Sequence, residues 1–205
     1  MQPTYEIDNP NLSYQTKLDL WQTGFGLQQV DGLEPSRYMV ELAKEQIEGK
    51  IDDQITKYHE ETDDSTKEAD IVSLRIVELL SSNAFKFAPT TLKSIHKELF
   101  FGVLSQGIPL GEYRHYNITK KEPILEGDSV IYDHYQTISD SLTYDFDQES
   151  QFDYRGKIPE EMVKHLKKFV SGIWQIHPFG EGNTRTVTVF MIKYLRSLGF
   201  EVDNS

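Results

Sequence analysis

The densest chemistry in the chain lies between His177 and Arg185, where the sequence reads His-Pro-Phe-Gly-Glu-Gly-Asn-Thr-Arg and runs into an apolar-periodic segment. A helix that begins near Asn183 would direct backbone N–H groups and the positive end of its dipole at this run, which favours an anion. Arg185 adds a fork of donors that suits phosphate oxygens. Glycines at positions 180 and 182 would let the backbone approach a ligand and adopt positive φ. The run therefore predicts a phosphate-binding loop.

A carboxylate in a phosphate-binding loop requires a cation between the two anions. Glu181 occupies such a position, and Mg²⁺ commonly binds one or two carboxylates together with substrate phosphates. His177, at the end of the preceding helical segment, has the pKa range of a general base for an incoming hydroxyl. A turn that leads into a helix cap, or a solvated loop, would explain Gly182, Asn183 and Glu181. Neither alternative requires His177 and Arg185 as well.

Other common motifs are absent from the sequence. There is no Gly-x-x-x-x-Gly-Lys-Ser/Thr phosphate loop and no His-Glu-x-x-His zinc motif. The remaining histidines lack a matching set of neighbours, so they are expected to be surface residues or hydrogen-bonded core residues: His59, His96, His115, His134 and His165.

Helical segments flank the loop on both sides. Apolar residues recur every three to four positions from Glu160 to Ile176 and from Asn183 to Leu198, and Gly199 is a natural stop for the second segment. The same spacing predicts helices from Thr66 to Ser82 and after Pro89. The loop is thus expected between two helices of a mainly α fold.

One interval breaks the helical pattern. Two β-prone runs, Tyr116 to Thr119 and Ser129 to Tyr132, flank Glu126-Gly127-Asp128. This arrangement predicts a β-hairpin with its loop near Gly127.

The first 65 residues are predicted to form a helical appendage that ends in an acidic linker. Ser36 is a candidate N-cap for a helix that Gly49 would close. The spacing of apolar residues from Ile51 to Tyr58 indicates a second, short helix. The acidic run from Glu60 to Asp64 is typical of a solvated connection.

Composition limits the classes of function. The formal net charge of -12 repels nucleic-acid backbones and anionic membranes, so neither is expected as a direct partner. The chain has no cysteine, which excludes disulfides and thiolate metal sites. No apolar run approaches the 18 residues of a membrane span, and the first residues lack the pattern of a signal peptide. These features predict a cytoplasmic protein.

The run from His177 to Arg185 resembles the signature of the Fic family, H-x-F-x-[D/E]-G-N-[G/K]-R, and obeys it at every position except Thr184. Gly111-Glu112-Tyr113-Arg114 and the hairpin after Asn117 are similar to the strand pair that is called the flap in this family. The resemblance implies a Fic-type helical bundle over residues 66–205, with the appendage over residues 1–65. Fic proteins commonly continue with further helices past the position of Ser205.

The resemblance implies that the protein transfers a nucleoside monophosphate, usually AMP from ATP, to a Ser, Thr or Tyr hydroxyl of a target protein, with Mg²⁺. His177 would be the general base and Glu181 the metal ligand. The nucleotide would be bound by Gly180, Gly182, Asn183, Thr184 and Arg185. The flap would dock the target by backbone pairing through Ile118, Thr119, Lys120 and Lys121.

Two departures from the family pattern leave the donor open. Thr184 replaces the usual glycine or lysine, and Thr188 stands where many Fic proteins carry a second arginine that holds the γ-phosphate. The alternatives are another nucleotide donor, removal of AMP, or a binding module without catalysis. The appendage is either regulatory or a structural completion of the core. A second copy of the chain or an antitoxin-like regulator is a further expected partner.

Overall fold

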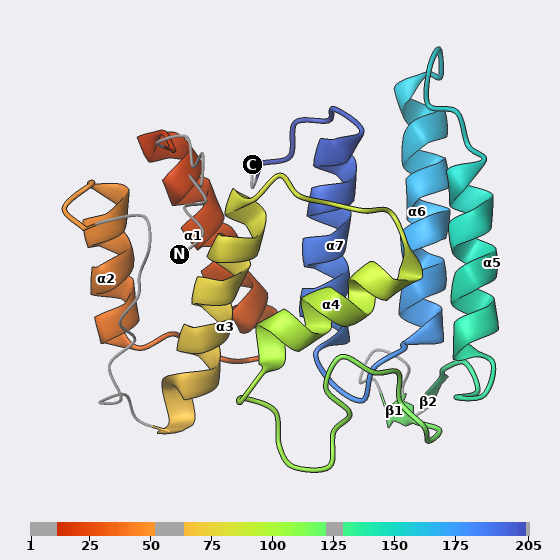
Figure 1. Ribbon diagram of the computed structural model, residues 1–205, viewed down its shortest axis with the longest axis horizontal. Helices are drawn as coiled ribbons and strands as arrows, with labels where there is room; N and C mark the ends of the chain where they lie inside the picture. Colours follow the sequence, from red (N-terminus) through yellow and green to blue (C-terminus); the bar gives the residue numbers. More distant parts are fainter. Residues whose placement is uncertain (1–11, 52–63, 122–128, 204–205) are drawn as a thin grey trace, which may run out of the picture. The chain divides into compact units, whose positions relative to one another are not determined.

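The computed structural model describes residues 12–51, 64–121 and 129–203 (Figure 1). Its contacts divide the chain into two compact units, one that runs up to Ser81 and includes Asp203, and one from Ser82 to Val202. The division lies at the end of a helix that the sequence pattern placed in the core domain, which was predicted to begin at residue 66.

The first unit contains α1 (Tyr14–Val30), α2 (Arg37–Ile47) and α3 (Asp64–Ser81). Ser36 caps α2 as predicted, because its hydroxyl accepts a 3.1 Å hydrogen bond from the N–H of Met39. Gly49 follows α2 with a φ of +72° and ends the helix, as its position predicted. The predicted helix from Ile51 to Tyr58 lies outside the described residues, apart from Ile51 itself.

Close packing of α1 on α3 depends on a glycine. A Cβ atom at Gly24 would lie 3.0 Å from the carbonyl oxygen of Ser73, and the Ser73 hydroxyl donates to the Gly24 carbonyl at 3.3 Å. The sequence pattern did not single out α1. Its buried side consists of residues of mixed character, which gives no clean apolar stripe: Leu20, Trp21, Gly24 and Gln28.

The second unit contains α4 (Pro89–Phe100), β1 (Thr119–Lys121), β2 (Ser129–Ile131), α5 (Ile138–Ser150), α6 (Pro159–Ile176) and α7 (Asn183–Ser197). Proline at the first position of α4 and α6 suits a helix start, since its missing N–H has no intrahelical partner there. The helices predicted over 66–82, after Pro89, over 160–176 and over 183–198 are confirmed as α3, α4, α6 and α7 within two residues at each described end. The fold class is therefore confirmed as mainly α with one small β-hairpin.

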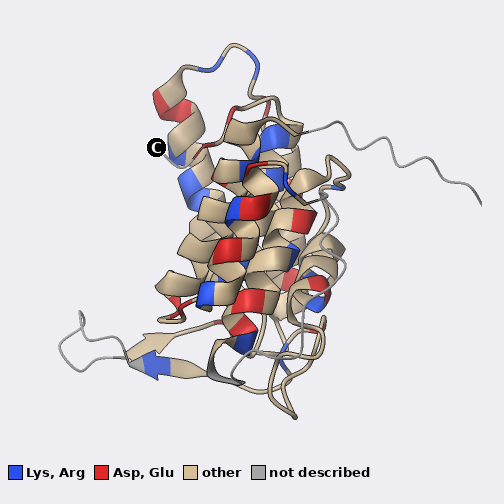
Figure 2. Ribbon diagram, turned by 90° about the vertical axis from the view of Figure 1, so that its left-hand side faces the viewer, with Lys and Arg blue, Asp and Glu red and all other residues tan. Residues whose placement is uncertain are grey.

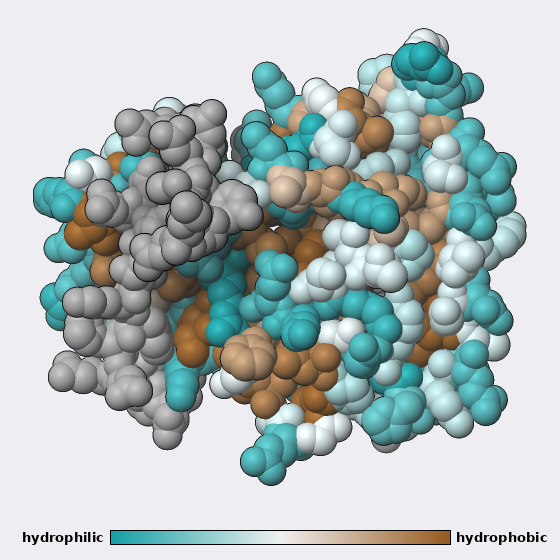
Figure 3. All heavy atoms as spheres, in the orientation of Figure 1, coloured by the Kyte–Doolittle hydropathy of each residue, from teal (hydrophilic) through white to brown (hydrophobic). Residues whose placement is uncertain are grey.

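Helix α7 packs against α4 and α6, and α5 packs against α6. Aromatic rings fill the space between them, and five contact one another in pairs with centroids 4.5 to 6.3 Å apart: Phe87, Phe146, Phe169, Phe190 and Tyr194. Acidic and basic residues are both spread over the helices that face the viewer in Figure 2. Hydrophilic and neutral residues cover most of α5 and α6 (Figure 3).

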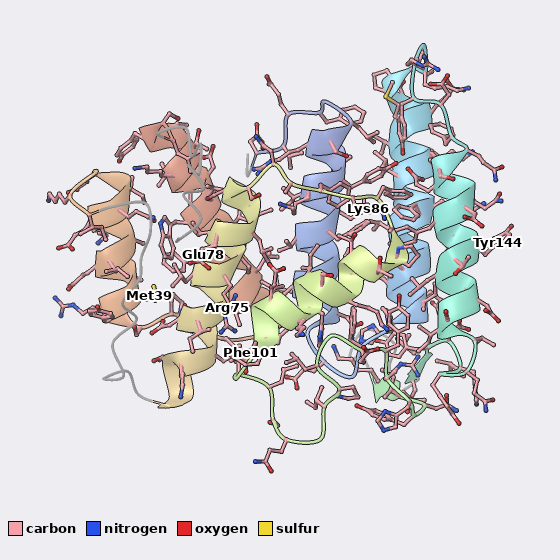
Figure 4. The ribbon with its side chains drawn as sticks, in the orientation of Figure 1. Met39, Arg75, Glu78, Lys86, Phe101 and Tyr144 are labelled. Atoms are coloured by element: carbon pink, nitrogen blue, oxygen red, sulfur yellow. The ribbon has the colours of Figure 1, made fainter. Side chains whose placement is uncertain are left out.

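Helix α5 was missed at the level of sequence. Its buried apolar residues form one narrow column at intervals of four, Ile138, Leu142 and Phe146, whereas a typical core-facing helix has a wider stripe. Tyr144 illustrates the exposed side, since it extends outward from α5 (Figure 4) and is 65% exposed. None of the helices that the structure describes combines the length and apolar character that a bilayer span requires.

Candidate active site

The loop between α6 and α7 begins at His177, which ends α6 in a left-handed conformation. Its φ and ψ are 48° and 65°, and its N–H donates to the carbonyl of Ile173 at 3.0 Å. Among the described residues, His177 is the one non-glycine residue with positive φ. Residues other than glycine rarely adopt this conformation, and those that do cluster at functional sites.

Asn183 holds the loop closed. Its side-chain oxygen accepts a hydrogen bond from the N–H of Phe179 at 2.9 Å, and its side-chain nitrogen donates to the Phe179 carbonyl at 2.8 Å. Both ends of the amide are therefore engaged within the loop. Asn183 was predicted to bind the nucleotide, and its backbone N–H at the start of α7 is the group that could serve that purpose.

Glycine is favoured at the two positions of the loop for different structural reasons. Gly182 has a φ of +70°, and a Cβ atom there would collide with the ring of Phe100. A Cβ atom at Gly180 would collide with the hydroxyl of Tyr116. The expectation of positive φ is confirmed for Gly182 and is wrong for Gly180. Gly180 is small because the Tyr116 hydroxyl lies against the loop.

The N-terminus of α7 brings the predicted phosphate-binding residues together. The first intrahelical bond runs from the N–H of Thr186 to the carbonyl of Gly182 at 3.1 Å, so the N–H groups of residues 183 to 185 precede it. Arg185 is only 1% exposed, and its guanidinium carbon lies 4.7 Å from the centroid of the Phe100 ring. Thr184 is half-buried. Together these groups form a positive, donor-rich end of a helix.

His96 of α4 contacts the loop through Phe179 and Glu181. The sequence predicted it only as a surface or hydrogen-bonded core residue. Its ring stacks on Phe179 with centroids 4.1 Å apart. Its Nδ1 accepts from the N–H of Gly111 at 2.9 Å, so Nε2 carries the proton that is donated to the Glu181 carbonyl at 3.1 Å. Burial lowers the pKa of His96 to about 4, against the raising effect of the Glu181 carbonyl. His96 is therefore neutral at pH 7 and fixes the backbone of Glu181.

The carboxylate of Glu181 belongs to an exposed side chain on this fixed backbone. Within the described part of the chain there is no group of three His, Cys, Asp or Glu residues that could hold a metal ion. A divalent cation at Glu181 would thus take its other ligands from water and from the oxygen atoms of a bound nucleotide. Mg²⁺ is the cation that is commonly held in this way, and an exposed carboxylate beside the donor-rich start of α7 fits it.

The ring of His177 is partly enclosed. It stacks on Tyr132 with centroids 4.0 Å apart. Burial is the largest cause that lowers its pKa to about 4; a hydrogen bond to the Trp174 carbonyl opposes this, and the charges of Arg114 and Lys120 add to it. Because one ring nitrogen donates to that carbonyl, the lone pair lies on the other nitrogen. His177 is a neutral proton acceptor at pH 7, and a bound anionic nucleotide would raise its pKa.

The β-hairpin adjoins this loop. Its strands pair antiparallel with Thr119 opposite Ile131 and Lys121 opposite Ser129, so the first strand lies later than the predicted run from Tyr116 to Thr119. The hairpin is tied to α6 through Gln175, whose side chain donates to the Ile131 carbonyl at 2.6 Å and whose carbonyl accepts from the N–H of Asp133 at 3.2 Å. Among the described residues the sheet has two strands, so β1 pairs on one side.

The predicted flap residues occupy β1 and the position before it. Ile118 is half-buried, Thr119 and Lys120 are exposed, and Lys121 closes the strand. The charge of Lys120 contributes to the lowered pKa of His177, which places the strand in the electrostatic environment of the loop. The predicted loop near Gly127 lies outside the described residues.

The order and geometry of these elements match a known family. The model of the Fic/DOC family matches residues 86–195, which is more than half of the chain. The chain belongs to the Fic/DOC family. Members of this family generally transfer a nucleoside monophosphate to proteins. A comparison with curated proteins finds no match.

Two solved structures have a similar fold. A Fic family protein from Desulfovibrio desulfuricans G20 has a TM-score of 0.60 at 14% identity, covering 92% of this chain and 50% of that one. A Fic domain containing signaling protein from Bacteroides thetaiotaomicron VPI-5482 has a TM-score of 0.63 at 14% identity, covering 91% of this chain and 64% of that one. The chain thus spans less than two thirds of either Fic protein, and at this identity the likeness supports the fold alone.

Proposed function

We propose that this Fic protein is an Mg²⁺-dependent protein adenylyltransferase, which transfers AMP from ATP to a Ser, Thr or Tyr hydroxyl of a target protein. The observation that carries the proposal is the loop that joins α6 to α7. It places a neutral, partly enclosed His177 at one end and the donor-rich start of α7, with Arg185, at the other. A proton acceptor and an anion site at the two ends of one short loop match the needs of nucleotidyl transfer.

In the proposed reaction His177 accepts the proton of the target hydroxyl at its lone-pair nitrogen. The hydroxyl oxygen then forms a bond to the α-phosphorus, while the bond from that phosphorus to the bridging oxygen breaks and pyrophosphate leaves. Arg185 and the N–H groups at the start of α7 would stabilise the negative charge on the phosphates. Glu181 would hold Mg²⁺, which when bound neutralises phosphate charge.

The hairpin gives the target a place to bind. A target segment in extended conformation would pair with the outer edge of β1, where backbone hydrogen bonds fix its register regardless of its side chains. The exposed Thr119 and Lys120 lie on this strand. The target hydroxyl would then be presented to His177, whose pKa is sensitive to Lys120.

A specific observation favours a second candidate, in which the same fold uses a different nucleotide donor. Thr184 and Thr188 are both half-buried and lie four residues apart, so they are neighbours on one side of α7. Two hydroxyls here offer hydrogen bonds but no positive charge for a terminal phosphate. A donor that depends less on γ-phosphate contacts would fit this surface.

The test is incubation of the protein in cell lysate with Mg²⁺ and ATP, GTP, CTP or UTP labelled at the α-phosphate, with His177→Ala as the control. A labelled protein band that requires His177 and ATP supports the proposal. A band that requires another nucleotide supports the second candidate. No label from any nucleotide, although a nucleotide protects the protein from thermal unfolding, would contradict both and indicate a binding module.

A further inference from the structure

Arg114 lies where the loop and the hairpin meet, and it is only 1% exposed. Its backbone N–H donates to the carbonyl of Pro178 at 2.8 Å. Its guanidinium donates to four further backbone carbonyls: Tyr116 at 2.8 Å, Asp133 at 2.5 Å, Ile176 at 3.1 Å and His177 at 2.9 Å. These four guanidinium hydrogen bonds all go to backbone carbonyls, so the backbone geometry fixes the place of this buried cation.

The five carbonyls belong to two segments. Three are consecutive and carry the proposed base, from Ile176 to Pro178. The other two flank the hairpin, since Tyr116 precedes β1 and Asp133 follows β2. The planar fork of an arginine can reach several acceptors in fixed directions, which the single ammonium of a lysine cannot do. One side chain therefore connects both ends of the hairpin to the backbone of His177.

A second link runs between the same two segments. Tyr132, next to Asp133, stacks on the His177 ring at 4.0 Å. Asp133 is itself fixed, because its carboxylate accepts from the hydroxyl of Ser141 on α5 at 2.5 Å and its N–H donates to Gln175 on α6. Tyr132 thus orients the ring of His177, and the next residue, Asp133, is bound to Arg114.

We propose that Arg114 is a positioning residue that joins the hairpin to His177, so that a target docked on β1 meets a base held at a fixed place relative to that strand. This inference rests on the proposed function, since base and target belong to it. The simpler alternative is that Arg114 only caps the carbonyl end of α6, as cations near helix ends commonly do. Capping alone predicts lower stability and, because a charge near His177 is lost in Arg114→Met, a higher pKa of His177, but no effect on the hairpin.

Two substitutions separate the charge of Arg114 from its geometry. Arg114→Lys keeps the charge and loses the fork, whereas Arg114→Met loses both. Tyr194→Phe is the matched control, because it removes a 2.6 Å buried hydrogen bond to Glu149 toward the C-terminal end of α7, away from the loop. All variants are made in the full chain, and each is checked for cooperative unfolding.

The first readout is the titration of the His177 ring by NMR without nucleotide, assigned with His177→Ala. Arg114→Met should raise the pKa of His177 above its value of about 4, since a positive charge that lowers it is lost, while burial, the larger cause, still holds the pKa below its ordinary value. The second readout is hydrogen exchange of the β2 amides from Ser129 to Ile131. Exchange should accelerate at least tenfold in Arg114→Met and in Arg114→Lys, and stay as in the wild type in Tyr194→Phe.

The outcomes decide the inference independently of transfer activity. If Arg114→Met folds and its β2 hydrogen exchange equals that of Tyr194→Phe, Arg114 is only a cap and the inference is overturned, whatever the pKa of His177. If Arg114→Met does not fold, hydrogen exchange in Arg114→Lys decides alone, and wild-type exchange overturns the inference. If the readouts change as expected but the wild-type protein transfers no nucleotide, the proposed function fails while the coupling of hairpin and His177 stands.

Discussion

The side chain of Asn183 makes two hydrogen bonds to the backbone of Phe179, at 2.9 and 2.8 Å, and so closes the loop that carries His177 and Glu181. The residue that begins α7 therefore also fixes the loop before it. Asn183, which the sequence predicted as a nucleotide-binding residue, thus has a structural role in the loop.

Asn183→Asp should destabilise the protein by about 1–3 kcal/mol, because a carboxylate cannot donate to the Phe179 carbonyl and repels it. Nucleotide affinity should fall as well, since the added negative charge lies beside the phosphate-binding helix end. Urea unfolding and calorimetric titration with ATP and Mg²⁺ measure the two effects. The control is Asn117→Ala, which removes an exposed 3.0 Å bond from the Tyr135 N–H and should cost less. Equal losses would contradict the structural role of Asn183.

Gly182→Ala should cost more than Gly199→Ala, although both glycines flank the same helix with positive φ. Gly182 has φ +70° and a Cβ there collides with Phe100, while Gly199 has φ +87° and nothing within 4 Å. Backbone strain costs about 1–2 kcal/mol at either position, and overpacking adds about 1–3 kcal/mol at Gly182. Chemical denaturation of both variants tests the difference. Similar midpoints would show that Phe100 moves aside without penalty.

The stability of the protein should fall as the pH drops from 6.5 to about 4. Burial lowers the pKa of His96 to about 4 in the folded state, so below 6.5 the unfolded chain binds a proton that the folded chain does not. The loss amounts to about 3 kcal/mol for such a shift. His177 contributes in the same window. The unfolding free energy should therefore depend less steeply on pH in His96→Gln than in the wild type.

His134→Gln is the control for the replacement of a histidine by glutamine as such, because His134 is exposed. If His96→Gln retained the full acid dependence, the cause would lie in other groups. The buried position of His96 would then have no part in it.

His177→Ala should retain nucleotide binding and lower the transfer rate by about 100-fold to 10,000-fold, the usual range for a general base. Arg185→Ala should weaken both, because Arg185 lies in the first turn of α7, which is the proposed phosphate site. Single-turnover transfer and thermal shift with nucleotide separate rate from binding. Transfer by His177→Ala at the wild-type rate would refute the assignment of the base.

The sequence was sufficient for the helices that flank the loop, because α6 and α7 each combine an apolar stripe with a recognisable boundary. It was also sufficient to bring residues 177 to 185 together, since they are consecutive. The narrow column of α5 and the mixed buried side of α1 were missed because periodicity was the main signal, and both helices depend on tertiary contacts such as the one between Gly24 and Ser73.

The supporting residues could not be predicted in the same way. His96 lies 85 residues before Glu181, and Arg114 lies 63 residues before His177. Their hydrogen bonds are to backbone groups, which every residue type offers, so the identity of the partner residue gives no signal. A histidine at an apolar-periodic position of α4 was the one available signal for His96. The resemblance to the Fic flap included Arg114 in the matching segment, but it assigned this residue no role.

The placement of His177 as the residue that ends α6 has a consequence for how the chain tolerates change in length. Each residue added to or removed from a helix rotates the rest of the chain by about 100° and shifts it by about 1.5 Å. An insertion within α6 would thus turn His177 away from Tyr132 and Arg114, which both precede α6 in the chain, even if the packing recovered. Natural variation in this protein should therefore conserve the length of α6 to the residue, and gains and losses of chain should gather in its surface turns.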